Sequence, residues 1–180
     1  MIKKIMLTLA LIVTILVIYA ALKPSTFRIV REVKISAPPE VIFMNINNSK
    51  NFDVWNPWSK LDPQMKKGFE GPDSGVGSIT TWDGNSQVGA GKSTVTESVP
   101  NSLVRMRLDY MKPFQSTSNA EFTLKPEGTE TVVSWSISGE SPFINRFVCI
   151  FMNMDKMIGG IFDKGLADLK HISEAAAGQK

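Results

Sequence analysis

Residues 103–137, LVRMRLDYMKPFQSTSNAEFTLKPEGTETVVSWSI, alternate between apolar and polar side chains in three consecutive segments. A period of two places every second side chain on the same face of a β-strand. The apolar faces carry Val104, Met106, Leu108 and Tyr110, then Ala120, Phe122 and Leu124, then Val133, Trp135 and Ile137. Turn residues separate the last two segments, at Pro126-Glu127-Gly128. The stretch therefore predicts consecutive antiparallel strands with one buried face.

Upstream, the same period recurs in residues 27–35, where one face carries Phe27, Ile29, Arg31, Val33 and Ile35. Between residues 65 and 99, glycine-containing turns separate further β-type segments, which extends the antiparallel meander. Between these strands, Pro38 and Pro39 open a short apolar helix, and residues 45–58 predict a second short helix and a loop.

Downstream of the strands, apolar residues from Phe143 to Leu169 recur at steps of three and four. That spacing predicts one long amphipathic helix, with Ser141 as its N-cap and Pro142 in its first turn. Gly159 and Gly160 interrupt the apolar stripe, which indicates a bend or a close approach to the sheet. The chain as a whole is expected to be an α+β protein.

The N-terminal segment is the second decisive feature of the sequence. Residues 5–22 contain no charged side chain, and as a helix they would span about 27 Å, close to the ~30 Å core of a bilayer. This run exceeds the ~7–15 apolar residues of a cleaved signal peptide. We therefore expect an uncleaved signal-anchor, with a single pass through the cytoplasmic membrane. The short tail before the span favours a cytoplasmic N-terminus and an extracytoplasmic domain.

Composition excludes several kinds of site. The single cysteine, Cys149, and the single histidine, His171, exclude an internal disulfide, a cysteine-built metal site and any mechanism with two imidazoles. We therefore expect no metal site and no cofactor. The net charge of +3 comes from three lysines around the N-terminal span, because the rest of the chain has 17 basic and 17 acidic residues. This balance argues against a nucleic-acid partner.

One glycine-rich motif is a misleading signal. Gly89-Ala90-Gly91-Lys92-Ser93 resembles the end of a phosphate-binding loop, but the required earlier glycine is replaced by Ser86, and the segment that follows is β-type. We therefore expect no nucleotide site there.

The order of these elements, together with the motifs ISAPPEVIF at residues 35–43 and WNPW at residues 55–58, resembles the SRPBCC (START-like, polyketide cyclase/dehydrase) superfamily. The glycine pair Gly75 and Gly77 and the closing FDKGLADLK at residues 162–170 carry the same resemblance. It implies a helix-grip fold, in which a seven-stranded antiparallel sheet wraps around a long C-terminal helix and encloses an apolar cavity. Members bind lipids or other hydrophobic molecules, and a minority are enzymes.

We therefore expect a membrane-anchored, non-catalytic binding domain for a hydrophobic small molecule or lipid. Strand parity and the helical stripe predict the cavity lining, namely Trp82, Val104, Met106, Leu108, Tyr110, Phe122, Trp135, Phe151, Met154, Ile158 and Phe162. Trp55 and Trp58 are expected at its entrance. The hypothesis requires a cavity of at least ~300 Å³.

Two alternatives stay open. The first is a polyketide cyclase/dehydrase-like enzyme, which requires a charged pair inside the cavity. Strand parity points the nearest charged groups outward, namely Arg105, Arg107, Asp109 and Glu121. The second is a protein-interaction module of the cell envelope or stress response, which predicts a filled core and an exposed apolar patch.

The predicted organisation has four parts. Residues 1–23 form the anchor, residues 24–26 a linker, residues 27–174 the START-like domain and residues 175–180 a frayed tail. The membrane is contacted through residues 5–22, and no protein partner is identified by the sequence.

Overall fold

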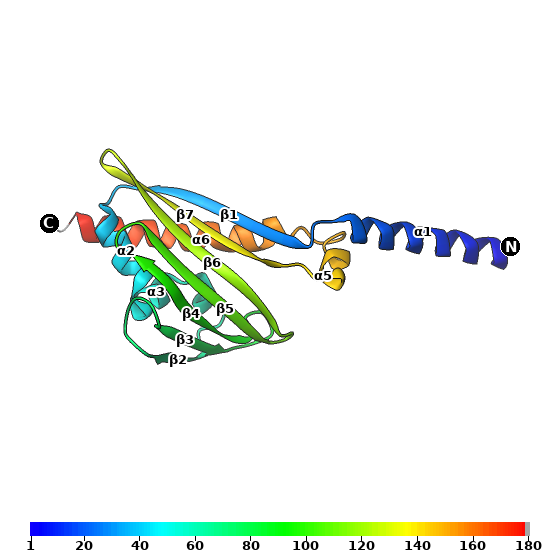
Figure 1. Cartoon of the computed structure of the whole chain (residues 1–180), viewed down its shortest axis with the longest axis horizontal. Coiled ribbons are helices and arrows are strands. Elements are labelled where there is room, and N and C mark those ends of the chain that lie inside the picture. The colour runs from blue at the N-terminus through cyan, green and yellow to red at the C-terminus, as the bar shows by residue number, and fades with distance from the viewer. Residues whose placement is uncertain (179–180) are drawn as a thin grey trace.

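The computed structural model describes residues 1–178, in which one long helix projects from a sheet and its covering helices (Figure 1). The strands are β1 (Thr26–Ile35), β2 (Lys66–Glu70), β3 (Ile79–Asp83), β4 (Ala90–Val99), β5 (Leu103–Lys112), β6 (Ser116–Glu127) and β7 (Glu130–Glu140). The helices are α1 (Ile2–Leu22), α2 (Pro39–Asn47), α3 (Ser49–Trp55), α4 (Pro57–Leu61), α5 (Phe143–Val148) and α6 (Met154–Ala177).

All seven strands form one antiparallel sheet in the order β1-β7-β6-β5-β4-β3-β2. Six consecutive strands make a meander, and β1 closes the sheet beside β7, with Thr26 opposite Glu140. The long helix α6 runs along the β1 side of the sheet (Figure 1). This arrangement confirms the expected helix-grip architecture.

Strand parity is confirmed where the sequence alternates most clearly. On β5, Val104 and Met106 are buried while Arg105 and Arg107 are exposed. On β6 and β7 the buried faces carry the predicted Ala120, Phe122 and Leu124, and Val133, Trp135 and Ile137. Because alternation fixes the face of each side chain, this local pattern is sufficient to define the inner side of the sheet.

The C-terminal helix is interrupted, and the prediction of one continuous helix from Pro142 is wrong. Pro142 is the N-cap of α5 rather than a first-turn residue, and α5 ends at Val148. A new helix starts after Asn153, whose side-chain oxygen accepts a hydrogen bond from the Lys156 N–H at 3.0 Å. Apolar residues recur at steps of three and four on both sides of the break, although no residue of α5 is buried, so the period alone did not reveal the break.

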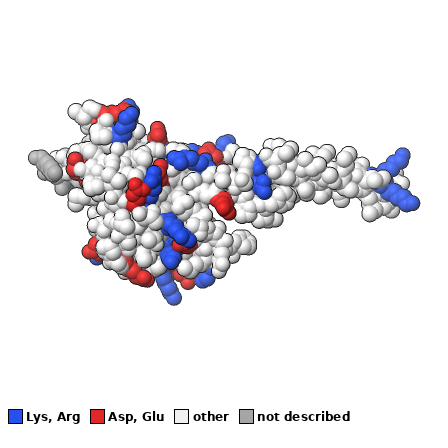
Figure 2. Space-filling view, in the orientation of Figure 1, with Lys and Arg blue, Asp and Glu red and all other residues white. Residues whose placement is uncertain are grey.

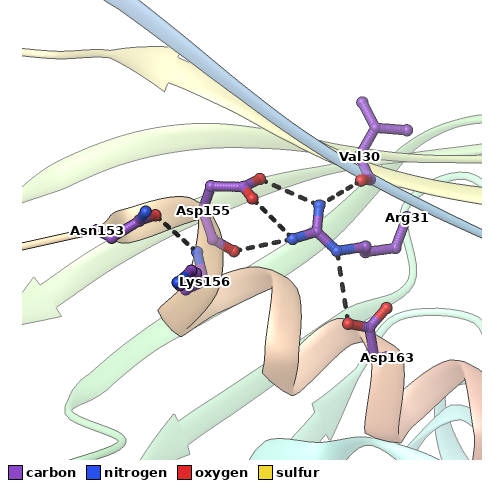
Figure 3. A network of polar contacts seen from close by, with 6 residues as sticks. All are labelled: Val30, Arg31, Asn153, Asp155, Lys156 and Asp163. Carbon is purple, nitrogen blue, oxygen red and sulfur yellow. Dashed lines mark hydrogen bonds and ion pairs between the residues drawn. The ribbon is translucent and has the colours of Figure 1, made fainter.

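Arg31 ties β1 to the start of α6 (Figure 3). Its guanidinium donates to both carboxylate oxygens of Asp155, at 3.0 and 2.9 Å, and Nε lies 3.5 Å from Asp163 Oδ2. Gly159 lies directly below this guanidinium, and a Cβ atom there would overlap it. The expected close approach at Gly159 is therefore confirmed, with an arginine of the sheet as the neighbour.

The N-terminal helix projects away from the domain, whereas the C-terminal helix packs against it. The helix α1 is long and apolar enough to cross a membrane, and its residues are exposed apart from the half-buried Leu16 and the buried Ala20. Its surface carries no charge between its tip and its junction with the domain (Figure 2). At the other end, the prediction of a frayed tail is wrong for residues 175–177, which continue α6, while residues 179–180 lie outside the described residues.

Candidate functional site: a cavity between the sheet and the short helices

A cavity of about 120 Å³ lies between the inner face of the sheet and the helices α3, α4 and α6. The prediction of a cavity of at least ~300 Å³ is therefore wrong for this conformation. A cavity of ~150 Å³ lined by aliphatic and aromatic side chains is nevertheless large enough for benzene. The present cavity is somewhat smaller than that, so in this conformation it has room for a very small apolar molecule or for one end of a longer one.

Most of the cavity wall is apolar and comes from the central strands. The predicted residues that line it are Trp82, Met106, Leu108, Tyr110, Phe122, Trp135 and Phe162, and Trp58 of α4 joins them. Residues outside the predicted cavity lining complete the apolar wall, namely Ile46, Phe52, Met65, Val88 and Val95, together with Ala120 and Ile137, which were predicted only to face inward. Strand parity identified the correct face, while the contributions of α2, α3 and the loops carried no periodic signal.

Five predicted residues lie elsewhere. Val104 and Trp55 are fully buried in the packed core, and the Trp55 Nε1 donates to the Asn45 carbonyl at 2.9 Å, so Trp55 is not an entrance residue. Ile158 packs against the core without lining the cavity, and Met154 is half-buried at the start of α6. Phe151 is 69% exposed, because the break between α5 and α6 directs this segment away from the sheet.

One side of the cavity is closed by stacked aromatic rings. Trp135 of β7 and Phe162 of α6 are parallel within 4°, with ring centroids 3.9 Å apart, and Phe122 also stacks on Trp135, with centroids 4.9 Å apart. Gly165 allows this contact, because a Cβ atom there would lie 2.9 Å from both Trp135 Cζ3 and Pro57 Cδ. The stack fixes α6 against the sheet and sets the limit of the open space.

The other side is bounded by Trp82 and Tyr110, whose rings meet edge to face at 5.9 Å. Trp82 lies opposite Gly91 of β4, and a Cβ atom at Gly91 would lie 2.7 Å from the indole ring. The glycine of the misleading phosphate-loop motif therefore makes room for a cavity-wall tryptophan. Burial raises the pKa of the Tyr110 hydroxyl to about 12, since the phenolate would be poorly solvated there.

A charged pair also reaches the cavity wall, and sequence reasoning missed its partnership. Lys67 of β2 lies 2.7 and 2.9 Å from the two carboxylate oxygens of Asp53 in α3, and the Ser59 hydroxyl donates to Asp53 Oδ1 at 2.8 Å. The Asp53 and Lys67 side chains are 27% and 21% exposed. Fourteen residues separate them in the sequence, and only the folding of α3 beside β2 brings them together.

The charged residues considered for catalysis on β5 and β6 face away from the cavity. Arg105 pairs with Glu121 at 2.7 Å and Arg107 with Asp109 at 2.9 Å on the outer face of the sheet. Neither Cys149 nor His171 lines the cavity, and the residues described by the structure contain no metal-binding group of three or more His, Cys, Asp or Glu side chains. Asp53 and Lys67 are therefore the charged groups that a ligand in the cavity would meet.

Residues 26–174 match the model of a family described as "Polyketide cyclase / dehydrase and lipid transport". A search of curated proteins found no significant match. A protein from Chromobacterium violaceum is 16% identical, with a TM-score of 0.59 over 84% of this chain and 99% of that chain. A major latex-like protein from Panax ginseng is 12% identical, with a TM-score of 0.58 over 83% and 99%. The Aha1 protein of Colwellia psychrerythraea, a dimer, is 17% identical, with a TM-score of 0.53 over 84% and 96%. At these identities the structures show a shared fold.

Proposed function

The chain belongs to the polyketide cyclase/dehydrase and lipid transport family, and on this premise we propose that it is a non-catalytic, membrane-anchored binding domain for a hydrophobic small molecule or lipid. The observation that carries the proposal is the apolar cavity between the sheet and the helices. Enclosed apolar walls with a few polar groups are typical of small-molecule sites.

The cavity wall suggests an amphiphilic ligand. Its aromatic and aliphatic side chains would remove an apolar body from water, at a gain of about 25 cal/mol per Å² of buried apolar surface. The Asp53–Lys67 pair at the cavity wall offers hydrogen-bonding groups to one polar end. Because the described cavity is about 120 Å³, a long-chain ligand would place only one segment inside or would displace the covering helices α3 and α4.

The helix α1 supports the membrane-anchored part of the proposal. It is 21 residues long, apolar and exposed, and therefore matches one pass through a bilayer. We further propose that the domain lies on the extracytoplasmic side of the cytoplasmic membrane. An anchor of this kind would hold the cavity close to a source of lipid-like ligands.

The Asp53–Lys67 pair supports one alternative, a polyketide cyclase/dehydrase-like enzyme. Two observations favour binding over catalysis. The carboxylate of Asp53 is already engaged by both Lys67 and Ser59, and both charged side chains keep contact with solvent. A general acid or base acts through a proton that is free to move to the substrate, whereas here the charges neutralise each other.

A matched pair of variants tests ligand binding. Leu108→Trp would fill the cavity, whereas Arg107→Trp adds the same side chain to the outer face at the next position of β5. We expect native mass spectrometry of the full-length chain to detect a co-purified apolar ligand in the wild type and in Arg107→Trp, and to detect none in folded Leu108→Trp.

Two other outcomes would change the conclusion. A wild-type chain that carries no ligand and binds none of a panel of lipids would favour a protein-interaction module. A wild-type chain that converts a bound compound, and loses this conversion in Asp53→Asn while still binding, would establish the enzyme.

A further inference from the structure

The segment between β7 and α6 is apolar on the outside. Its exposed side chains are Phe143, Ile144, Val148, Phe151 and Met152, which we call the α5 patch. Phe151 and Ile144 are 69% and 65% exposed. Residues 141–154 include one charged residue, Arg146, and no acidic one. A contiguous patch of this kind on a protein surface is typical of an interaction site.

The strand pairing of the sheet places the α5 patch beside the C-terminal end of α1. Because β1 and β7 pair antiparallel, the start of β1, which follows α1, lies beside the end of β7, which leads to α5. The Ser141 N–H donates to the Ser25 carbonyl at 2.7 Å and joins the two connections. In Figure 1, α5 lies next to the C-terminal end of α1.

Two cations fix α5 to this end of α1. Arg146 Nη1 donates to the carbonyls of Ala21 and Lys23, at 3.2 and 3.1 Å, and Lys23 Nζ donates to the Cys149 carbonyl at 3.0 Å. These bonds satisfy carbonyl groups that are left free where a helix ends. The guanidinium of Arg146 therefore points toward α1, and the outward face of the segment stays apolar.

We propose that the α5 patch lies in the surface of the same bilayer that α1 crosses. This inference rests on the proposal that α1 anchors the chain in a membrane. The helices α1 and α5 are in contact, and both carry exposed apolar side chains at this junction, so a membrane that surrounds α1 would reach the level of α5. Apolar side chains of such segments enter the boundary between headgroups and acyl chains by ~5–10 Å. Contact at α5 would hold the domain at a fixed tilt and keep α6 close to the lipid surface.

Spin labels on the full-length chain in vesicles of phosphatidylcholine and phosphatidylglycerol test this contact. In a Cys149→Ser background, single cysteines replace Phe151 or Ile144 in the patch, Leu11 in α1, and Val54 in α3. Val54 is exposed like the patch residues and belongs to α3, which lies well away from α1 in Figure 1. We expect labels at positions 151 and 144 to collide with oxygen and not with a water-soluble nickel chelate, at a depth of ~5–10 Å. The label at position 54 should meet the chelate.

The label at Leu11 separates failure of the contact from failure of the anchor. If position 11 is in the bilayer while positions 151 and 144 meet the chelate as position 54 does, the patch does not touch the membrane and the proposal is wrong. If position 11 also meets the chelate, α1 does not span the membrane and both proposals fail. If the patch labels are shielded from both reagents, a protein surface such as a second copy of the chain covers them instead.

Discussion

The two halves of the sheet bury similar side chains, yet one half is filled and the other is hollow. Beside α6, the rings of Trp135, Phe162 and Phe122 stack in direct contact and form the wall at which the open space ends. Under β3–β5, residues of the same kind, such as Trp82, Tyr110 and Leu108, face the cavity. The filled half shows how the helix is fixed, and the hollow half shows where a ligand would bind.

The difference has a geometric cause. Seven strands about 4.8 Å apart make a sheet roughly 29 Å wide, whereas a helix with its side chains is about 10–12 Å across. The single long helix α6 packs along β1 and therefore leaves the distant strands to the short helices α3 and α4. Short helices cover less surface, so space remains beneath them.

The largest expected effect is in the filled half. Phe162→Ala removes a fully buried ring from the stack with Trp135, and we expect a loss of about 3–5 kcal/mol in the free energy of unfolding. Leu108→Ala, in the hollow half, is the control, and it should cost less than about 2 kcal/mol because the Leu108 side chain is smaller and only half-buried. Urea unfolding of the chain in detergent, followed by tryptophan fluorescence, measures both values. Equal losses would mean that the two halves are packed alike.

Titration of Tyr110 tests how far water reaches the cavity wall in the hollow half. Its pKa is raised to about 12 by burial, so the neutral phenol is favoured in the folded state. The resulting stabilisation is fully present below the ordinary pKa of 10.0 and is lost as the pH rises through about 12. In Tyr19→Phe, Tyr110 is the only tyrosine, and we expect little tyrosinate absorbance at pH 11. A midpoint near 10 would show that water reaches this wall freely.

Two glycines of α6 differ in their surroundings, because Gly165 is packed against other residues and Gly160 faces open space. Gly165→Ala would press a methyl group against Pro57 and Trp135, and we expect a loss of about 1–3 kcal/mol in stability. Gly160 has nothing within 4 Å of its Cβ position, so Gly160→Ala should increase stability by up to ~1 kcal/mol. Chemical unfolding of both variants gives the two values, and a neutral Gly165→Ala would contradict the close stack.

The smallest effect is expected at the edge of the filled half. The hydrogen bond from Arg31 lowers the pKa of Asp155 below its ordinary value of 3.8. The carboxylate therefore stabilises the fold above pH 3.8, and this contribution is lost as the pH falls below that value. We expect Asp155→Asn to lower the melting temperature slightly at pH 7 and to differ less from the wild type at pH 3. The side chain is 61% exposed, so a large loss at pH 7 would contradict the expectation for an exposed pair.

The sequence by itself determined the strands, their inner faces, the apolar N-terminal helix and the amphipathic character of the C-terminal region. These features depend on periods of two and of three to four residues, which are local and can be read along the chain. The inner positions of Trp135 and Leu108 follow from such periods. The folded structure decided the break between α5 and α6, the depth of Trp55 and Val104, and the exposure of Phe151.

Tertiary structure alone also decided the cavity and its charged pair. Asp53 pairs with Lys67, and Arg31 pairs with Asp155, because separate helices and strands pack side by side in the folded chain. The cavity volume is the space left after every side chain has packed, so it depends on the whole arrangement of α3, α4 and α6 over the sheet. A periodic pattern shows which side of a strand is buried, but it carries no information about how completely the opposite elements fill the space.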